Sequence, residues 1–295
     1  MTLNIAQLAS TVRVLDGAWG TELQKRGLPT GHATELWNVE NTDAVEAVAD
    51  SYVQAGSEII LTNTFGANRF VLERHGLGPR VAELARAGVT ISRRAAARAG
   101  ALVFAAIGPT GKIVMTGEVS PEELADAFAQ AARAIADAGA DAVVLESFAE
   151  LDEIELALQA VKSACSLPVV ASMTFGSGPD GTRSVMGVTP EQLAQMALAN
   201  GAAAVGGNCG AGPENFVKVA QLLRQASPLP VWIKANAGLP VLAAGKTTFP
   251  MGPAAFAACA PALIAAGAAF VGGCCGTTPD HIRVLREVVD TAAMR

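Results

Sequence analysis

One pattern repeats along this 295-residue sequence and limits the folds open to it. Each unit has a short apolar run typical of a β-strand, then a polar or Gly-rich loop, then apolar residues at helical spacing. The apolar runs are continuous rather than alternating, which predicts parallel strands buried on both faces. The eight strand-like runs are residues 12–17, 58–65, 102–108, 142–148, 168–175, 202–209, 230–238 and 268–275.

Helical stretches are expected to begin near Asp43, Arg80, Ser120, Glu150, Thr189, Pro213, Gly252 and Thr278. Two of these starts are explicit, because Ser120-Pro-Glu-Glu123 and Thr189-Pro-Glu-Gln192 place a hydroxyl at the N-cap and an acid or amide at N3. Eight strand–helix units favour a closed (β/α)8 (TIM) barrel over an open doubly wound sheet. We therefore expect one α/β domain over residues 1–295, with the long loops 20–41 and 237–256 as insertions at the barrel mouth.

Composition excludes several classes of protein. Apolar residues make up 51% of the chain and charged residues 16%, against a usual charged share of about 25%, so a large core is expected and disorder is not. The net charge of −6 and the lack of a basic cluster argue against nucleic-acid binding. No apolar run is long enough to span a membrane and the first residues do not form a signal peptide, so a cytoplasmic location is expected.

Three of the five cysteines lie at strand ends, where barrel enzymes carry their active sites. Cys209 follows the sixth strand-like run, and Cys274 and Cys275 close the eighth. Three thiolates with a fourth position open are typical of catalytic zinc, whereas structural zinc sites have four protein ligands. The alternative is a rim of small residues with buried thiols. Cys165, after a helix, and Cys259, inside an Ala-rich helix, are expected to be packing residues.

Other polar residues at strand ends are candidates for ligand contacts. Asp16 follows the first strand, where it could instead cap a loop, and Glu146 ends the fourth, where an unpaired buried carboxylate would be costly. Thr62, Asn63 and Thr64 are either ligand contacts or polar supports of the rim. The three histidines, His32, His75 and His281, are expected to be surface or capping residues, and His32 could enter the site from its long loop.

These motifs together resemble the homocysteine-binding methyltransferase family, over nearly the whole chain. The residues that carry the resemblance are Leu15-Asp-Gly-Ala-Trp-Gly-Thr-Glu22, Leu61-Thr-Asn-Thr-Phe-Gly-Ala67, Ile107-Gly-Pro-Thr-Gly111, Glu146-Ser-Phe148, Met173-Thr-Phe175, Asn208-Cys209, Asn236-Ala-Gly-Leu-Pro240 and Gly272-Gly-Cys-Cys-Gly-Thr-Thr-Pro279. The last two blocks look most like the homocysteine-binding module of cobalamin-dependent methionine synthase.

The resemblance implies a zinc-dependent homocysteine S-methyltransferase that forms methionine. Zn²⁺ would be held by Cys209, Cys274 and Cys275, with the homocysteine thiol as fourth ligand. Asp16 and Glu146 would pair with the homocysteine ammonium. The loop from Gly17 to Gly20 would offer backbone N–H groups to its carboxylate. Asn236 would lie next to the metal, where it could be a ligand when no substrate is bound, and Thr64 is a further candidate contact.

The resemblance also implies partners. The sequence carries no folate-binding or corrinoid domain of its own, so methylcobalamin would be supplied on a separate corrinoid-binding protein, served in turn by a folate-binding protein. Three positions depart from the family pattern: Ala106 where an acidic residue is usual, Gly210 where Ser is common, and Ala235 where Pro is common. These changes leave zinc binding intact but could alter the pocket.

Three other functions stay open. The methyl donor could be a free compound such as betaine or S-methylmethionine. The chain could be a demethylase-type module that moves methyl groups between a methylated substrate and a corrinoid protein. It could also be a non-catalytic barrel that binds homocysteine or zinc as a sensor or scaffold, although such a binder has no need of an open metal position.

Overall fold

The structure is a computed structural model that describes residues 3–243 and 246–293. Residues 1–2, 244–245 and 294–295, which belong to the expected domain 1–295, lie outside the described residues. Among the described residues, no helix has the length and apolar character needed to cross a membrane.

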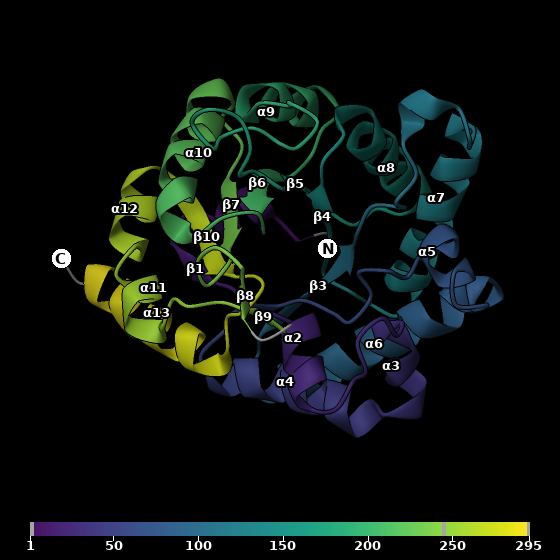
Figure 1. Ribbon diagram of the computed structural model, residues 1–295, viewed down its shortest axis with the longest axis horizontal. Coiled ribbons are helices and arrows are strands. Elements are labelled where there is room, and N and C mark those ends of the chain that lie inside the picture. Colours follow the sequence, from purple (N-terminus) through teal and green to yellow (C-terminus); the bar gives the residue numbers. More distant parts are fainter. Residues whose placement is uncertain (1–2, 244–245, 294–295) are drawn as a thin grey trace.

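The described chain forms a ring of parallel strands, seen end-on in Figure 1. In ring order the strands are β1 (Arg13–Val14), β10 (Ala268–Gly273), β7 (Val231–Ala235), β6 (Ala204–Asn208), β5 (Val169–Met173), β4 (Ala142–Phe148), β3 (Leu102–Ile107) and β2 (Ile59–Ile60). A parallel bridge between Leu15 and Ile59 joins β1 to β2 and closes the ring. The expected (β/α)8 barrel is therefore confirmed.

Helices surround the ring, as Figure 1 shows. The main ones are α4 (Thr42–Gln54), α6 (Val81–Ala96), α7 (Pro121–Asp137), α8 (Leu151–Ala164), α9 (Pro190–Ala199), α10 (Pro213–Ala226) and α13 (Pro279–Ala293). Both expected capping boxes are present, at the starts of α7 and α9. The helix expected near Gly252 is divided into α11 (Pro253–Ala257) and α12 (Ala260–Ala265), so Cys259 lies at their junction and not inside one helix.

Short elements fill the loops: α1 (Ile5–Leu8), α2 (Gly20–Lys25), η1 (Thr34–Leu36), α3 (Trp37–Glu40), α5 (Arg69–Glu73), η2 (Gly78–Arg80), η3 (Val114–Thr116), β8 (Val241–Ala243) and β9 (Lys246–Thr248). The expected loop 20–41 thus contains three short helical elements. Glu35 ties this loop to the segment after β2, because it accepts a 2.6 Å hydrogen bond from the Gly66 N–H. The buried Glu22 pairs with Lys25 and Arg26 within the loop itself. The loop 237–256 contains the antiparallel β8–β9 hairpin.

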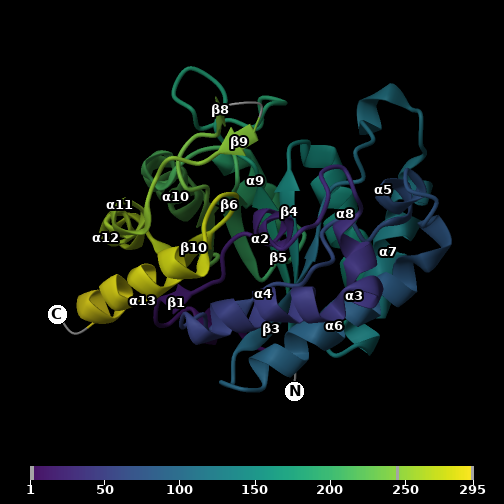
Figure 2. The ribbon, with the colours of Figure 1, turned by 60° about the horizontal axis from the view of Figure 1, so that its bottom comes forward.

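The barrel interior is filled by a layer of aromatic rings. Trp232 stacks on Phe104 at 5.7 Å between ring centroids and tilts against Phe270 at 5.5 Å. Below this layer, Ile5 of α1 packs into the same inner cluster. Figure 2 shows the chain start at one end of the barrel and the β8–β9 hairpin at the other. The aromatic layer and Ile5 of α1 thus fill the barrel interior toward the end where the chain begins.

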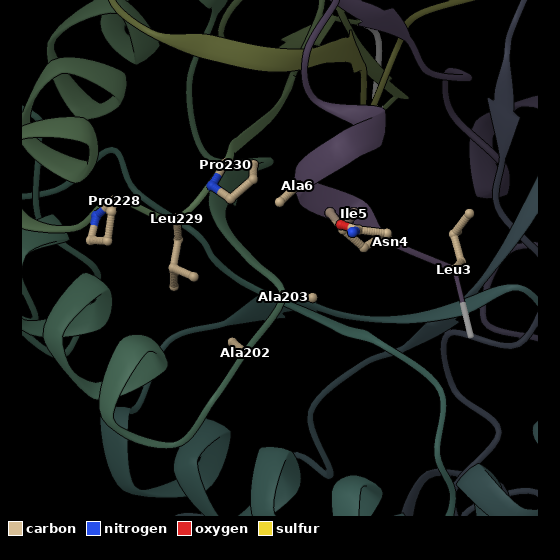
Figure 3. A pocket seen from close by; sticks show the side chains of 9 residues that line it. All are labelled: Leu3, Asn4, Ile5, Ala6, Ala202, Ala203, Pro228, Leu229 and Pro230. Atoms are coloured by element: carbon tan, nitrogen blue, oxygen red, sulfur yellow. The ribbon is translucent and has the colours of Figure 1, made fainter. Parts of the chain in front are cut away.

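A hollow at the lower end is lined by residues 3–6, 202–203 and 228–230 (Figure 3). These residues lie on α1 and on the segments that lead into β6 and β7. The hollow is thus at the amino ends of the strands, the face that supports barrel stability, while chemistry in such barrels takes place at the carboxyl ends. It carries no titratable side chain among these residues.

Replacing Gly206 by Ala tests how closely β6 and β7 approach each other. A Cβ at this position would lie 2.1 Å from the carbonyl oxygen of Trp232, which the β6–β7 ladder holds in place. We expect Gly206→Ala to lower the free energy of unfolding by about 1–3 kcal/mol or more, measured by denaturant titration. Gly252→Ala is the matched control, because a Cβ there meets nothing within 4 Å. Equal stability of the two variants would contradict the packing argument.

Candidate metal centre

The sulfur atoms of Cys209, Cys274 and Cys275 converge at the upper rim. All three lie within 4.8 Å of one another, and the Sγ atoms of Cys209 and Cys275 are 3.9 Å apart. Cys209 follows β6 and the other two follow β10, so the thiols meet from either side of β7. Cys165 and Cys259 lie elsewhere, at the end of α8 and before α12, and each thiol donates to a backbone carbonyl one helical turn back.

The cluster fits a tetrahedral thiophilic metal. Zn–S bonds of about 2.3 Å at tetrahedral angles place sulfur atoms about 3.8 Å apart, close to the separation of Cys209 and Cys275. Backbone geometry aims these side chains. Cys209 has a left-handed φ of 60°, and its N–H donates to the Lys234 carbonyl at 3.0 Å. The Cys274 N–H donates to the Ala235 carbonyl at 2.7 Å, which fixes the second loop against the same strand.

The three thiols share their protons unequally. Hydrogen bonds from Cys274 and Cys275 lower the pKa of Cys209 to about 3. The same bonds, together with burial, raise the pKa of Cys274, and they raise the pKa of Cys275 to about 12. The cluster alone therefore releases one proton easily and retains two. A divalent cation stabilises thiolates and displaces their protons, so it would also remove the two protons that the cluster alone retains.

Glu146 reaches the rim through an irregularity in β4. The pairing of β4 with β5 shifts register between Leu145 and Phe148, and Ser147 has a left-handed φ of 64°. Asn208 holds this kink: its Oδ1 accepts from the Ser147 N–H at 2.9 Å, and its Nδ2 donates to the Ser147 hydroxyl at 2.7 Å. Ser172 donates to the same Oδ1 at 2.7 Å. The kink thus directs the Glu146 carboxylate by way of Asn208.

Burial raises the pKa of Glu146 to about 7, against the opposing effect of the Lys234 charge. In the described part of the chain, no side chain or backbone group forms a hydrogen bond with this carboxylate. Its side chain is only 8% exposed. A buried acid with no partner is costly unless a ligand compensates it, so Glu146 is a strong candidate for a ligand contact.

Asp16 differs from Glu146 because its carboxylate is already bound. Its Oδ2 accepts from the Trp19 indole N–H and from the Leu61 N–H, both at 2.7 Å. Its Oδ1 pairs with the Lys234 ammonium, and both side chains are buried. The predicted contact of Asp16 with a ligand ammonium stays a prediction, and this carboxylate is held by three donors of the chain itself.

The loop after Asp16 is tied to the cysteine loop. The Thr277 hydroxyl donates to the Cys274 carbonyl at 2.7 Å and accepts from the Ala18 N–H at 3.1 Å. Gly17 must lack a side chain, because a Cβ there would lie 2.7 Å from both the Thr277 and the Tyr52 hydroxyls. In the described chain the N–H groups of Gly17 and Gly20 donate to no protein acceptor. These two groups can therefore serve a ligand oxygen.

Asn236 and Thr64 occupy different surroundings. The Asn236 side chain helps lower the pKa of the Cys209 thiol, while its Oδ1 is buried without a partner in the described chain. This places Asn236 beside the thiol cluster. Thr64 is fully buried, and its hydroxyl contacts the Thr62 hydroxyl at 2.5 Å and donates to the Ala106 carbonyl at 2.7 Å. Thr64 thus links the loop after β2 to β3, and its role as a ligand contact stays a prediction.

Two polar residues at this rim were not predicted as site residues, although Asn208 belongs to the Asn208-Cys209 motif. Lys234 and Asn208 both sit within strand-like runs. The signal for Lys234 was its place two residues after Trp232 and two before Asn236, because alternate residues of a strand face the same side. The three histidines are surface or capping residues, as expected. His32 and His75 are exposed. His281 is buried, caps the Thr278 N–H and contacts the Met251 carbonyl at 2.9 Å.

Replacing Glu146 by Gln tests the burial of this carboxylate. Its pKa lies near 7 in the folded chain and near 4.5 in the unfolded chain, so the stability that the protonated acid contributes is lost as the pH rises between these values. This shift corresponds to about 3 kcal/mol. In chelator-treated protein, we expect Glu146→Gln to gain about that much unfolding free energy over the wild type between pH 4.5 and pH 8.

The control for this titration is Glu122→Gln, an exposed carboxylate in the first turn of α7. It should show no such gain with pH. A flat difference between Glu146→Gln and the wild type across this pH range would show that the carboxylate ionises freely in the folded protein.

Comparison with known proteins places the chain in a family. The model of the homocysteine S-methyltransferase family matches residues 13–289. Methionine synthases of Mycobacterium tuberculosis and Mycobacterium leprae are each 32% identical over 96% of the chain. The chain spans about a quarter of the length of these relatives, 25% and 24%.

A solved structure of a homocysteine methyltransferase is similar over nearly the whole chain. The metallated form of the homocysteine methyltransferase MmuM from Escherichia coli superposes with a TM-score of 0.79 and 26% identity, over 96% of this chain and 98% of that one. Its oxidized form gives a TM-score of 0.77. The chain belongs to the homocysteine S-methyltransferase family.

Proposed function

We propose that residues 1–295 form one zinc-dependent homocysteine S-methyltransferase barrel that makes methionine, with the methyl group delivered by a separate methylated corrinoid protein. The observation that carries the proposal is the cluster of three thiols at the ends of β6 and β10, with sulfur separations that suit tetrahedral zinc. Membership of the homocysteine S-methyltransferase family supports the substrate. The metallated state of the related MmuM protein supports the metal.

The metal ligands in this proposal are Cys209, Cys274 and Cys275. When bound, zinc would supply a Lewis-acidic position at which an incoming thiol is deprotonated near neutral pH. That position stays accessible because the cluster found among the described residues consists of three cysteines and no fourth His, Cys, Asp or Glu. Asn236 lies beside Cys209 with a free buried oxygen, which can hold a proton-bearing group or a water next to the acceptor sulfur.

The acceptor is oriented by groups on β4 and on the segment after β1. Glu146, with no partner in the described chain, faces the substrate ammonium. The N–H groups of Gly17 and Gly20 receive the carboxylate. With its sulfur ionised, homocysteine attacks the methyl carbon of the donor: the new S–C bond forms, and the donor keeps the electron pair of the bond that breaks. Positioning and deprotonation are thus the contributions of the barrel.

The corrinoid donor rests on similarity to the two methionine synthases, which this chain matches over about a quarter of their length. A free small donor, betaine or S-methylmethionine, is the second candidate. It is favoured by the likeness to MmuM, a homocysteine methyltransferase that this chain covers over 98% of its length. A module that moves methyl groups to or from a corrinoid protein would use the same thiol cluster with another methylated substrate.

Replacing Cys275 by Ser tests the metal site. We expect Cys275→Ser to bind less than about a tenth of the zinc of the wild type, measured by atomic emission after dialysis, and to lose turnover together with zinc, because serine is a poor zinc ligand. Cys259→Ser is the matched control, since Cys259 lies between α11 and α12, away from the cluster. Retention of zinc by Cys275→Ser would exclude the proposed ligand set.

The methyl donor is tested by methionine formation from L-homocysteine. Zinc-loaded protein with free methylcobalamin is expected to form methionine, and a chelator is expected to abolish this activity, because the acceptor thiol is then no longer deprotonated. The same assay with betaine and with S-methylmethionine distinguishes the second candidate. Methionine from either of these, and none from methylcobalamin, would refute the corrinoid donor and leave the acceptor assignment intact.

A further inference from the structure

Tyr52 is the only tyrosine of the chain, and its side chain is completely buried. It lies on α4, outside the motifs that resemble the family, and its hydroxyl donates to the Ala18 carbonyl at 2.7 Å. Burial raises the pKa of this hydroxyl well above its usual value, so the hydroxyl keeps its proton and remains a donor. Tyr52 thus holds the loop whose N–H groups are proposed to receive the acceptor carboxylate.

The backbone of Ala18 is held at both of its polar groups. Tyr52 binds the carbonyl, and the Thr277 hydroxyl accepts from the N–H at 3.1 Å. We call these two hydroxyls the Ala18 clamp. The Thr277 hydroxyl also donates to the Cys274 carbonyl at 2.7 Å. The loop lies directly against the clamp, since a Cβ on Gly17 would be 2.7 Å from both hydroxyls. The clamp therefore ties this loop to the segment that carries two of the three clustered thiols.

Neighbouring contacts fix the direction of the free N–H groups. The Asp16 carbonyl accepts from the Gly273 N–H at 2.9 Å. The C=O and N–H groups of a trans peptide point in opposite directions, so the Gly17 N–H is directed away from Gly273. The Trp19 indole N–H donates to the Asp16 carboxylate at 2.7 Å, which orients the residue before Gly20. The peptide groups between these two free N–H groups are the ones that the Ala18 clamp holds.

We propose that Tyr52 is a positioning residue for the acceptor carboxylate. Through the Ala18 clamp it holds the loop so that the N–H groups of Gly17 and Gly20 face this carboxylate. Two donors already held in place bind an anion more tightly than donors on a loop that must first be ordered. Without the Tyr52 hydroxyl, the carbonyl of the buried Ala18 would lose its donor. This inference rests on the proposed function, since it takes an amino-acid thiol as the acceptor.

A matched pair of thiols tests the inference. L-homocysteine and 3-aminopropane-1-thiol both carry an ammonium, and only the first carries a carboxylate. Their binding to Co²⁺-substituted protein is measured by the change in visible absorption when the thiolate joins the metal, a readout that needs no methyl donor. We expect the wild type to bind L-homocysteine at least about tenfold more tightly, because hydrogen bonds to a charged group are strong.

Tyr52→Phe removes the hydroxyl and keeps the ring. We expect it to reduce the preference for L-homocysteine at least about fivefold, while the Kd of 3-aminopropane-1-thiol stays within about twofold of the wild-type value. Thr277→Val removes the other hydroxyl of the Ala18 clamp and should reduce the preference in the same way. Ser51→Ala is the matched control, because its hydroxyl is on the same helix but donates to the Val48 carbonyl at 2.7 Å. It should leave the preference unchanged.

The outcomes separate the two proposals. A preference that folded Tyr52→Phe leaves unchanged, or a loss of affinity that is equal for the two thiols, would overturn the role of Tyr52 and keep the acceptor site. If Tyr52→Phe does not fold, the same results with Thr277→Val decide the question. Equal binding of the two thiols by the wild type would refute the carboxylate contact and this inference with it. Absence of an absorption change with either thiol would instead overturn the proposed function.

Discussion

The buried charge of Asp16 is the interaction on which the barrel mouth depends. β1 and β2 have only two residues each, so their backbone ladders are short at the point where the ring must close. The Asp16 carboxylate extends the closure by accepting from the Leu61 N–H after β2, and its carbonyl accepts from the Gly273 N–H at the end of β10. Lys234 of β7 completes the junction. A buried ion pair stabilises a fold only when further hydrogen bonds satisfy it, and Asp16 has them.

Strand register then explains why the thiols meet. Asn208 pairs with Lys234 on one side of β7, and Gly273 pairs with Ala235 on the other. The residues that follow, Cys209 and Cys274, are therefore brought to nearly the same height across Asn236. Parallel strands that end level are a property of the whole barrel, so the three thiols are positioned by the ring and not by the loops alone.

The sequence was sufficient for the fold and for the convergence of the cysteines, because both follow from counting strand-like runs and reading the residues at their ends. The capping boxes at Ser120 and Thr189 could be predicted as well, because they depend only on neighbouring residues. The register shift at Ser147 could not be predicted, since it depends on a partner residue, Asn208, on another strand. The pairing of Lys234 with Asp16 joins positions 218 residues apart, and no local pattern specifies such a contact.

Asn208 connects the two halves of the site. A left-handed φ at a non-glycine residue costs about 1–3 kcal/mol and persists only where the surroundings enforce it. Ser147 and Cys209 both have this conformation, and Asn208 bonds the first and directly precedes the second. The carboxylate of Glu146 and the sulfur of Cys209 are therefore oriented through one buried amide. A displacement of β6 would move the Cys209 sulfur and the Glu146 carboxylate together, which preserves the distance between the proposed metal ligand and the proposed contact of the acceptor ammonium.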